Sequence, residues 1–372
     1  MQVAALQLQG VRNLAPLQLV PGPRFNVFHG DNGQGKTNLL EAVYVLATLR
    51  SFRTTTLAQV IGHGAERATM AARVIRSELD RRYQVVVEPQ RRTALVDDKP
   101  VRPFARYFGA FNVVLFAPED LAVVRGAPAE RRRFLDRTVF GRRATFLATM
   151  QEHEKVLRSR NAVLRGLAEG ARSGGDLLEV YDQQLAPLAV AVVQERRALL
   201  DAMSPRVAAV FAAITGGELA LTLGYDTSPE LAAADAAAVR ARYQADRPRD
   251  LARRSTSTGP HRDDLRLTLA GHEAAAFASQ GQTRALVLAW KIAELDLLLE
   301  THGDPPLLLL DDVSSELDDT RNAYLFEHLS QRSGQCFITT TDPRHVRIAA
   351  DRRDRVDHEV RAGLVSPVIS TH

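Results

Sequence analysis

The 372-residue sequence is poor in cysteine, lysine and tryptophan, and it has no long apolar run. Its one cysteine, Cys336, cannot form a disulfide within the chain, which is typical of a protein in a reducing compartment. No apolar run reaches the ~18 residues that a membrane helix needs. Residues 1–13 have neither the basic start nor the apolar core of a secretory signal. We therefore expect a cytoplasmic protein without membrane segments.

Lysine is nearly absent although the chain is basic. Four of the 48 basic residues are lysines, namely Lys36, Lys99, Lys155 and Lys291. The formal net charge is +4 and the sequence pI is about 9.4. Arginine binds phosphate through a bidentate fork, so a nucleic-acid partner is one interpretation. The other interpretation is a GC-rich coding bias, which replaces lysine with arginine at solvated positions. The charge of the chain alone does not distinguish the two interpretations.

The pattern of apolar residues divides the chain into a mixed α/β part and a mainly helical part. Short alternating runs in residues 3–30 and 72–101 predict strands, the latter as an antiparallel meander. Residues 119–215 have helical periodicity, and short strands return within 217–270. The last hundred residues predict, in order, a helix at 283–300, a strand at 307–310, a helix at 318–331 and a strand at 336–339. The simplest interpretation is one α/β domain made from both ends of the chain and interrupted by a mainly helical lobe.

A phosphate-binding loop is predicted at residues 30–37, GDNGQGKT, which fit G-x-x-x-x-G-K-[ST]. An apolar strand leads into it and an amphipathic helix leads out. Glycines allow successive backbone N–H groups to face one phosphate chain, and the helix adds the positive end of its dipole. Lys36 would reach the β- and γ-phosphates of ATP, and Thr37 would place its hydroxyl on Mg²⁺. The alternative is that Asn32 and Gly33 form a hairpin turn, but the helical stripe after Thr37 argues against a second strand there.

A carboxylate for the metal is supplied by LLLLDD at residues 307–312. Four leucines predict a central parallel strand, and Asp311 leaves its C-terminal end, where ligands of α/β proteins bind. We assign Asp311 to Mg²⁺, through a water molecule, and Asp312 to the polarisation of the attacking water. The alternative is that the two aspartates form a helix cap or an acidic turn. The presence of a phosphate loop in the same chain favours the metal assignment over this alternative.

The segment SQGQTR, residues 279–284, opens a strongly apolar helix and has no reactive side chain. Its free N–H groups and the helix dipole form a second end suited to phosphate, and Ser279 and Gly281 would let a phosphate approach closely. One nucleotide does not need two such ends from one chain. The economical hypothesis is a two-fold dimer in which each segment caps the ATP held by its partner. An ordinary polar helix cap remains the alternative.

With these motifs together, the chain resembles the ATP-binding-cassette heads of chromosome-maintenance and repair ATPases, and in particular the RecF family of bacterial recombination mediators. The resemblance is carried by SFRT (51–54), PEDLAVVRGAPAERRRFLD (118–136), TGPHRDDL (258–265), FASQGQTRAL (277–286) and LLLLDDVSSELD (307–318), which extend along the whole chain. It implies an α/β ABC-type ATPase head, with a P-loop sheet and an antiparallel meander, at residues 1–117 and 252–372. It also implies an inserted, mainly helical second lobe at residues 118–251.

The resemblance assigns roles residue by residue. ATP would be bound in cis by Arg12, Asn13, Gly30, Asp31, Asn32, Gly33, Gln34, Gly35, Lys36, Thr37 and Asn38, and in trans by Ser279, Gly281 and Gln282. Lys36, Asp311 and Asp312 would be catalytic, with Thr37 and Asp311 at the metal, while Ser315 and Asp318 would lie in the loop that crosses the dimer interface. Two departures stand out: Asp312 replaces a longer glutamate, and no histidine follows the last strand, so Thr340 or Thr341 would serve as the switch. No glutamine occupies the glutamine-loop position near residues 115–120.

Two functions from different classes remain to be compared. The resemblance implies slow, Mg²⁺-dependent ATP hydrolysis, an ATP-dependent homodimer on double-stranded, single-stranded or gapped DNA, and help in loading RecA together with RecO and RecR. The alternative is the ATPase subunit of a transporter, against which stand the large insertion and the SQGQ signature. The arginine clusters at 131–133, 142–143, 196–197 and 253–254 are not distinguished from solvated or ion-paired faces, so no DNA-contacting residue is assigned.

Overall fold

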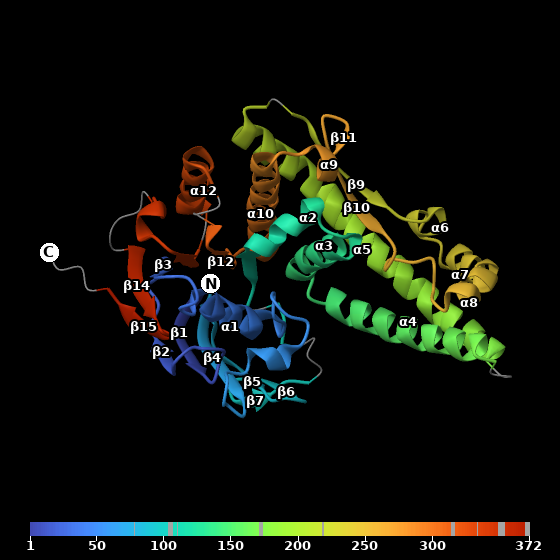
Figure 1. Cartoon of the computed structure of the whole chain (residues 1–372), viewed down its shortest axis with the longest axis horizontal. Helices are drawn as coiled ribbons and strands as arrows, with labels where there is room; N and C mark the ends of the chain where they lie inside the picture. The colour runs from blue at the N-terminus through green and yellow to red at the C-terminus, as the bar shows by residue number, and fades with distance from the viewer. Residues whose placement is uncertain are drawn as a thin grey trace. The chain divides into compact units, whose positions relative to one another are not determined.

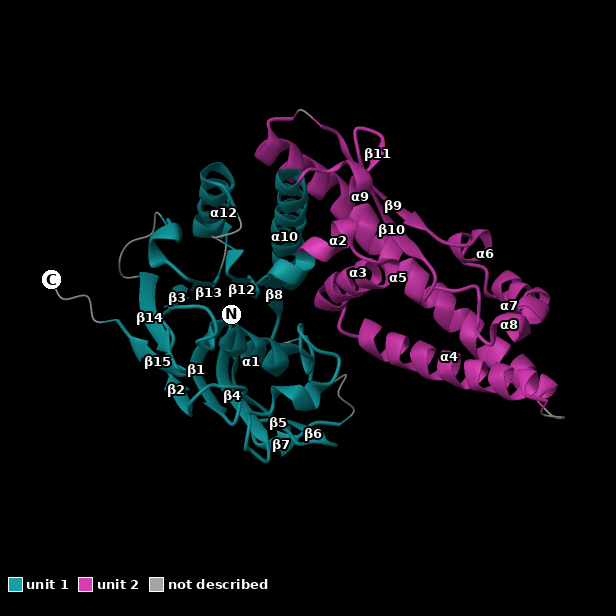
Figure 2. Ribbon diagram, in the orientation of Figure 1, with its two compact units in different colours: residues 1–120, 280–372 teal, residues 121–279 magenta. Residues whose placement is uncertain are grey.

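In the computed structural model (Figure 1) the chain divides into two units, Met1–Asp120 with Gln280–His372, and Leu121–Ser279 (Figure 2). The structure describes residues 1–77, 79–102, 107–109, 111–170, 174–217, 219–313, 317–332, 334–348 and 354–368. Unit 1 contains both ends of the chain, and with them the predicted phosphate loop at 30–37 and the LLLLDD segment at 307–312, whereas unit 2 is the insertion.

The predicted antiparallel meander forms one sheet of unit 1. Among the described residues it has six strands in the order β2-β1-β4-β5-β6-β7. The bounds are β1 Gln2–Gln9, β2 Leu17–Leu19, β4 Ala68–Arg76, β5 Leu79–Val87, β6 Arg92–Val96 and β7 Lys99–Pro100, with the short 3-10 helix η1 at Leu57–Val60. Alternate residues face one side: Tyr83, Val85 and Val87 of β5 are buried while the residues between them are less so. A hairpin turn at Asp97 and Asp98, both with positive φ, joins β6 to β7.

A second, mostly parallel sheet carries the nucleotide-binding motifs. Its order within the described part of the chain is β15-β14-β3-β13-β12-β8. The bounds are β3 Phe25–His29, β8 Val113–Phe116, β12 Leu307–Asp311, β13 Cys336–Thr340, β14 Arg355–Arg361 and β15 Leu364–Pro367, with 3-10 helices η3 Pro118–Leu121 and η4 Pro343–His345. Strands β3, β8, β12, β13 and β14 are parallel, and β15 closes the edge as an antiparallel strand. The continuous leucine run of β12 is explained by its central place, because both faces are covered.

Helices lie on both faces of the parallel sheet. Helix α1 (Lys36–Thr48) packs between this sheet and the meander, in a core that also takes Leu307 and Leu309 of β12. Leu308 and Leu310 alternate to the opposite face, where α10 (Gln280–His302) and α12 (Asp319–Arg332) pack (Figure 1). The phosphate loop and the SQGQTR helix are therefore on opposite faces of one sheet.

Unit 2 is built on long helices and a small sheet. Its helices are α2 Ala122–Arg125, α3 Pro128–Arg142, α4 Phe146–Ala168, α5 Gly175–Thr215, α6 Pro229–Ala232, α7 Ala236–Ala245, α8 Arg247–Arg253 and α9 Ala274–Phe277. Strands β9 Leu221–Asp226, β10 Asp264–Leu269 and β11 His272–Glu273 pair in the order β11-β10-β9. Helix α5 packs against α4, α7 and β9 through apolar residues such as Leu185, Ala189 and Val193, which are fully buried.

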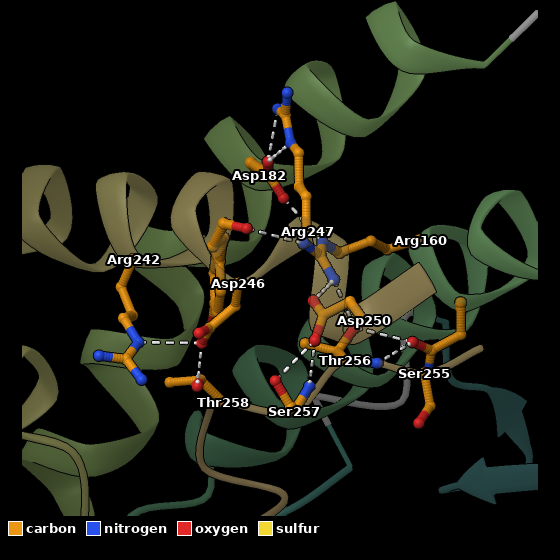
Figure 3. Close-up of polar contacts among 12 residues, drawn as sticks. Arg160, Asp182, Arg242, Asp246, Arg247, Asp250, Ser255, Thr256, Ser257 and Thr258 are labelled. Carbon is orange, nitrogen blue, oxygen red and sulfur yellow. Dashed lines mark hydrogen bonds and ion pairs between the residues drawn. The ribbon is translucent and has the colours of Figure 1, made fainter. Parts of the chain in front are cut away.

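An ionic network lies inside unit 2 (Figure 3). Arg160 of α4 is fully buried and donates through Nε to Asp182 and through Nη1 to Asp250, each at 2.7 Å. Its Nη1 also donates to Thr256 at 2.8 Å. Asp250 in turn accepts from the backbone N–H and hydroxyl of Ser257. A buried guanidinium with several oxygen acceptors compensates for lost hydration, so Arg160 fixes residues 250–257 to α4 and α5.

The second unit boundary differs from the predicted one. The family resemblance implied that residues 252–279 belong to the ATPase head, whereas the structure places them in unit 2. The reason is the pairing of β10 with β9 along its whole length, from Asp264 opposite Asp226 to Leu269 opposite Leu221. The first boundary, predicted at 117/118, lies at 120/121. Ser279 is thus the last residue of unit 2 and Gly281 belongs to the first turn of α10.

Helix α5 is, of the described residues, the one segment long and apolar enough to cross a membrane by length and composition. Its most apolar 18-residue window has a mean hydropathy of 1.4 and is 28% buried. The helix also carries the buried Asp182 and Arg196, whose polar partners lie inside unit 2. Helices at the centre of a domain pass the same compositional test.

Candidate nucleotide site

The loop that connects β3 to α1 has the backbone of a phosphate-binding loop. Gly30, Gly33 and Gly35 have φ values of 150°, 78° and 114°, which L-residues with a side chain rarely adopt. A Cβ on Gly30 would also lie 2.3 Å from the carbonyl oxygen of Val360. Asp31, Asn32 and Gly33 form the exposed tip. No side chain caps α1, so its first N–H groups are available to a phosphate.

Lys36 is folded back onto this loop. Its Nζ donates to the carbonyl oxygens of Gly30 at 2.7 Å and Asp31 at 2.9 Å. Burial lowers the pKa of Lys36, while the carboxylates of Asp312, Asp311 and Asp31 oppose that shift. If a phosphate took the place of these carbonyl oxygens, both partners of each hydrogen bond would be charged, and the ammonium would be held more strongly.

The Thr37 hydroxyl and the Asp311 carboxylate, the two groups predicted to hold Mg²⁺, are in contact. Oγ1 of Thr37 donates to Oδ1 of Asp311 at 2.9 Å. Burial raises the pKa of Asp311, and the hydroxyls of Thr339 and Thr37 lower it in part. A hydroxyl and a carboxylate at one point, next to a loop for phosphates, fit the ligand preference of Mg²⁺, which binds through one or two protein oxygens plus substrate phosphates.

Thr339 of β13 is the threonine that supports these carboxylates. Its Oγ1 lies 2.8 Å from Oδ1 of Asp311 and accepts the backbone N–H of Asp312 at 3.0 Å. Of the two threonines considered from the sequence, Thr340 instead bonds the carbonyl and N–H of Asp342 in the following turn, and Thr341 is exposed. Asp312 itself has a φ of 50°, a left-handed conformation that is unusual for a residue with a side chain.

Glu119, in the 3-10 helix η3, lies within the segment 115–120 where a glutamine was sought. Strand β8 is parallel to β12 with Phe116 opposite Leu310, so residues just beyond 116 follow the same edge as Asp311 and Asp312. Burial raises the pKa of the Glu119 carboxyl, and the charge of Asp311 adds to that shift. The Glu119 carboxyl group is therefore close enough to Asp311, one of the residues predicted to hold the metal, for the two charges to interact.

Arg12 and Asn13 lie beside the loop, as the sequence indicated. Asn13 Nδ2 donates to the carbonyl of Gly33 at 3.0 Å, and Asn38 Nδ2 donates to Asn13 Oδ1 at 2.7 Å. Gln34 holds the β14–β15 turn, because its Oε1 accepts the N–H of Ala362 at 2.6 Å. An open hollow next to these residues is lined by Arg12, Asn13, Leu14, Ala15, Asn38, Arg53, Gln59, Ile61, His63 and Ala362.

A buried carboxylate that the sequence analysis missed organises this hollow. Glu41 of α1 is 0% exposed and accepts Nε and Nη2 of Arg12, both at 2.9 Å. The hydroxyl of Ser51 also donates to Glu41, and Arg53 lies 3.8 Å away while donating to Asn38 at 2.7 Å. Ser51 and Arg53 belong to the SFRT motif, to which no role was assigned. Glu41 gave no signal because it follows the loop within an otherwise apolar helical stretch.

The SQGQTR segment has the expected local structure at the start of α10. Ser279 and Gln280 are exposed, and Gly281 and Gln282 are partly exposed. Asp318 caps α12, because its Oδ1 accepts the N–H of Arg321 at 2.9 Å. Ser315, which was assigned to the same loop, lies outside the described residues.

Comparison with known proteins agrees with these motifs. Residues 2–362 match the family model described as RecF/RecN/SMC N terminal domain. Relatives described as DNA replication and repair protein RecF are similar over nearly all of both chains. One from Anaeromyxobacter sp. (strain Fw109-5) is 43% identical over 100% of each chain, and one from Myxococcus xanthus (strain DK1622) is 44% identical over 94% and 93%.

The chain belongs to the RecF family. A solved structure of the "recombination mediator protein RecF-ATPrS in RecFOR pathway" has a TM-score of 0.89 at 27% identity and covers 99% of this chain and 98% of that one. An SMC head bound to a ScpA domain has a TM-score of 0.54 at 15% identity, which shows a shared fold alone. The predicted fold class, an ABC-type ATPase head with an inserted helical lobe, is confirmed.

Several arginines of this RecF-family chain that were considered as DNA contacts form ion pairs or hydrogen bonds inside unit 2. Arg131 pairs with Asp264, Arg132 donates to the carbonyl of Asp263 at 2.7 Å, and Arg196 pairs with Asp136 while only 2% exposed. These groups hold residues 258–264 in place and are not a solvated basic face. Arg253 and Arg254, in contrast, are exposed.

Proposed function

We propose that this chain is an ATP-dependent DNA-binding protein of recombinational repair in the cytoplasm. ATP binding closes two copies head to head on gapped or junction DNA, and slow hydrolysis opens them again. In this proposal the chain cooperates with RecO and RecR and aids the loading of RecA on single strands. The family relationship supports a role in replication and repair, because the relatives carry that description and the matched structure is assigned to the RecFOR pathway.

The observation that carries the proposal is the hydrogen bond between Thr37 and Asp311 next to Lys36. These groups come from the first turn of α1 and the end of β12, and they converge where a β- and γ-phosphate would lie on the N-terminus of α1. Lys36 exchanges its two carbonyl acceptors for phosphate oxygens. Thr37 and Asp311 would hold Mg²⁺, which would supply positive charge to the phosphates.

Hydrolysis is expected to be slow because the carboxylate that polarises water is short. Asp312 emerges one residue after the metal ligand, with its N–H fixed on Thr339. An aspartate reaches one methylene less far than a glutamate from the same backbone position. A water molecule is then held less closely to the γ-phosphate, which raises the barrier for its attack. A long-lived ATP state suits a protein whose task is to stay closed on DNA.

Dimerisation follows from the place of the second phosphate-binding end. The phosphate loop leads into α1 on one face of the parallel sheet, and Gly281 and Gln282 begin α10 on the other. Two heads related by a two-fold axis can each present the start of α10 to the other's ATP. In this arrangement Ser279, Gly281 and Gln282 act in trans, and neither nucleotide is fully enclosed by one chain.

DNA affinity measured with and without ATP tests the proposed function. We expect tight binding to gapped DNA with Mg²⁺ and ATP, and weaker binding without nucleotide or to plain duplex and single strands. Affinity should fall steeply with salt, because phosphate contacts release counterions. Lys36→Arg should fold normally yet neither hydrolyse ATP nor gain DNA affinity from it. Equal affinity with and without ATP in the unaltered chain would contradict the proposal.

A further inference from the structure

Arg321 of α12 lies directly over Gly281 at the start of α10. A Cβ on Gly281 would be 3.3 Å from Nη1 and 3.5 Å from Nη2 of Arg321. Gly281 is part of the α10 helix and is not among the positive-φ residues. A Cβ at this position would crowd the guanidinium, whereas the backbone conformation itself would allow a side chain.

The guanidinium of Arg321 is held at this place by Asp318. Nη1 of Arg321 forms an ion pair with Oδ2 of Asp318, while Oδ1 of Asp318 accepts the backbone N–H of Arg321 at 2.9 Å. The Asp318 side chain is 51% exposed and that of Arg321 is 22% exposed. Nε of Arg321 is buried and has no hydrogen-bond partner among the described residues. The half-exposed carboxylate of Asp318 is thus the ion-pair partner of the mostly buried guanidinium of Arg321.

The position is electrostatically suited to an anion. A cation at a helix N-terminus is unfavourable, because the dipole of α10 is positive at that end. The arrangement is tolerated because Asp318 supplies a negative charge. A phosphate at the same point would satisfy the guanidinium, whose fork matches phosphate oxygens, and would lie at the positive end of the α10 dipole.

We propose that Arg321 binds the terminal phosphate of the ATP held by a second copy of the chain, and that this phosphate replaces Asp318 as the partner of the guanidinium. The inference rests on the proposed two-fold dimer and adds a positively charged residue to its trans side. Asp318 remains the cap of α12 through Oδ1 when its ion pair is broken. The pair then acts as a contact that opens only when nucleotide arrives from the partner.

Substitution of each partner separates this role from an ordinary ion pair within α12. Dimerisation is measured by sedimentation with Mg²⁺ and a slowly hydrolysed ATP analogue. Arg321→Gln should weaken the dimer by about tenfold or more for each of its two sites, since hydrogen bonds to charged groups contribute about 1.5–3 kcal/mol. Arg321→Lys should restore part of the loss as a point charge. Asp318→Asn should strengthen the dimer, because asparagine keeps the helix cap but releases the guanidinium.

Opposite signs for Arg321→Gln and Asp318→Asn are the result that supports the proposal. Both variants weakening the dimer, or neither changing it, would show that the pair only stabilises α12. The analogue affinity of the monomer should be unchanged in both variants, and a loss in Arg321→Gln would place the residue in its own chain's site and overturn the trans role. An unaltered chain that stays monomeric with the analogue would contradict the two-fold dimer itself, a different failure from that of Arg321.

Discussion

Thr37 and Asp311 are 274 positions apart in the sequence, yet Oγ1 of Thr37 donates to Oδ1 of Asp311 at 2.9 Å. The contact joins the first turn of α1, which follows β3, to the end of β12, with β13 between the two strands. The two oxygen groups assigned to Mg²⁺ in the proposed site therefore already lie together. The remaining rearrangement is the release of Lys36 from the carbonyls of Gly30 and Asp31.

Thr339→Val should reduce hydrolysis and raise the Mg²⁺ concentration needed for half-maximal rate, each by about tenfold or more, because groups that orient metal ligands have effects of that size. The substitution removes the hydroxyl that contacts Asp311 and accepts the N–H of Asp312. Thr340→Val is the matched control, since Thr340 is equally buried and its hydroxyl bonds the turn at Asp342. Steady-state rates over a Mg²⁺ titration measure both. A larger effect from Thr340→Val would contradict the assignment.

Glu41→Gln should weaken ATP binding by about tenfold, because Arg12 loses a bidentate, charge-assisted pair that fixes it beside the phosphate loop. Arg12→Ala should give a similar loss. The double variant should be no weaker than either single variant, since residues in one network are not additive. Equilibrium titration with a fluorescent ATP analogue provides the measurement. Fully additive losses would show that Glu41 acts on ATP without Arg12.

Arg160→Met should destabilise unit 2 by about 3–5 kcal/mol, because it leaves the buried Asp182 and Asp250 without their shared cation. Arg158→Met on the same helix is the matched control. Arg158 is 72% exposed and pairs with Glu154 at 3.9 Å, so its loss should change stability by less than about 1 kcal/mol. Chemical unfolding followed by circular dichroism compares the two. Equal effects would mean that the network of Figure 3 does not stabilise the unit.

His153 should make stability depend on pH. Burial lowers the pKa of His153 to about 3 in the folded chain, from an ordinary value near 6.5. The unfolded chain therefore binds a proton first as pH falls, so the stability is fully present above about pH 6.5 and is lost progressively toward pH 3. At pH 5 the loss is about 2 kcal/mol. Melting temperatures at pH 7.5 and pH 5 should converge more in His153→Phe than in the exposed-site control His272→Gln; identical pH slopes would contradict this.

Local signals in the sequence were sufficient for much of the nucleotide site. Residues 30–37 combine glycine spacing with a flanking strand and helix, and four leucines before Asp311 indicate a strand buried on both faces. Both predictions depend on neighbours in the chain. The family resemblance then extended them to α10 and to the inserted unit.

The residues that the sequence did not reveal depend on contacts between distant segments. Glu41 is identified by Arg12 and Ser51, which reach it from other segments, and Thr339 by a neighbouring strand. The unit boundary near 279 depends on β10 pairing with β9, which periodicity cannot show. Arg131, Arg132 and Arg196 looked like surface charge until their partners were known. Such pairings have no signature within a window of sequence.

The mass of the chain in solution with Mg²⁺ and ATP tests the central claim most directly. Light scattering of Asp312→Asn, which should bind ATP without hydrolysing it, is expected to show the 40.9 kDa chain shifted to about twice that mass. Ser279→Arg should bind ATP with ordinary affinity and remain at the monomer mass, because its side chain would block the partner's phosphate. A normal ATP-dependent dimer in Ser279→Arg would contradict the sandwiched arrangement.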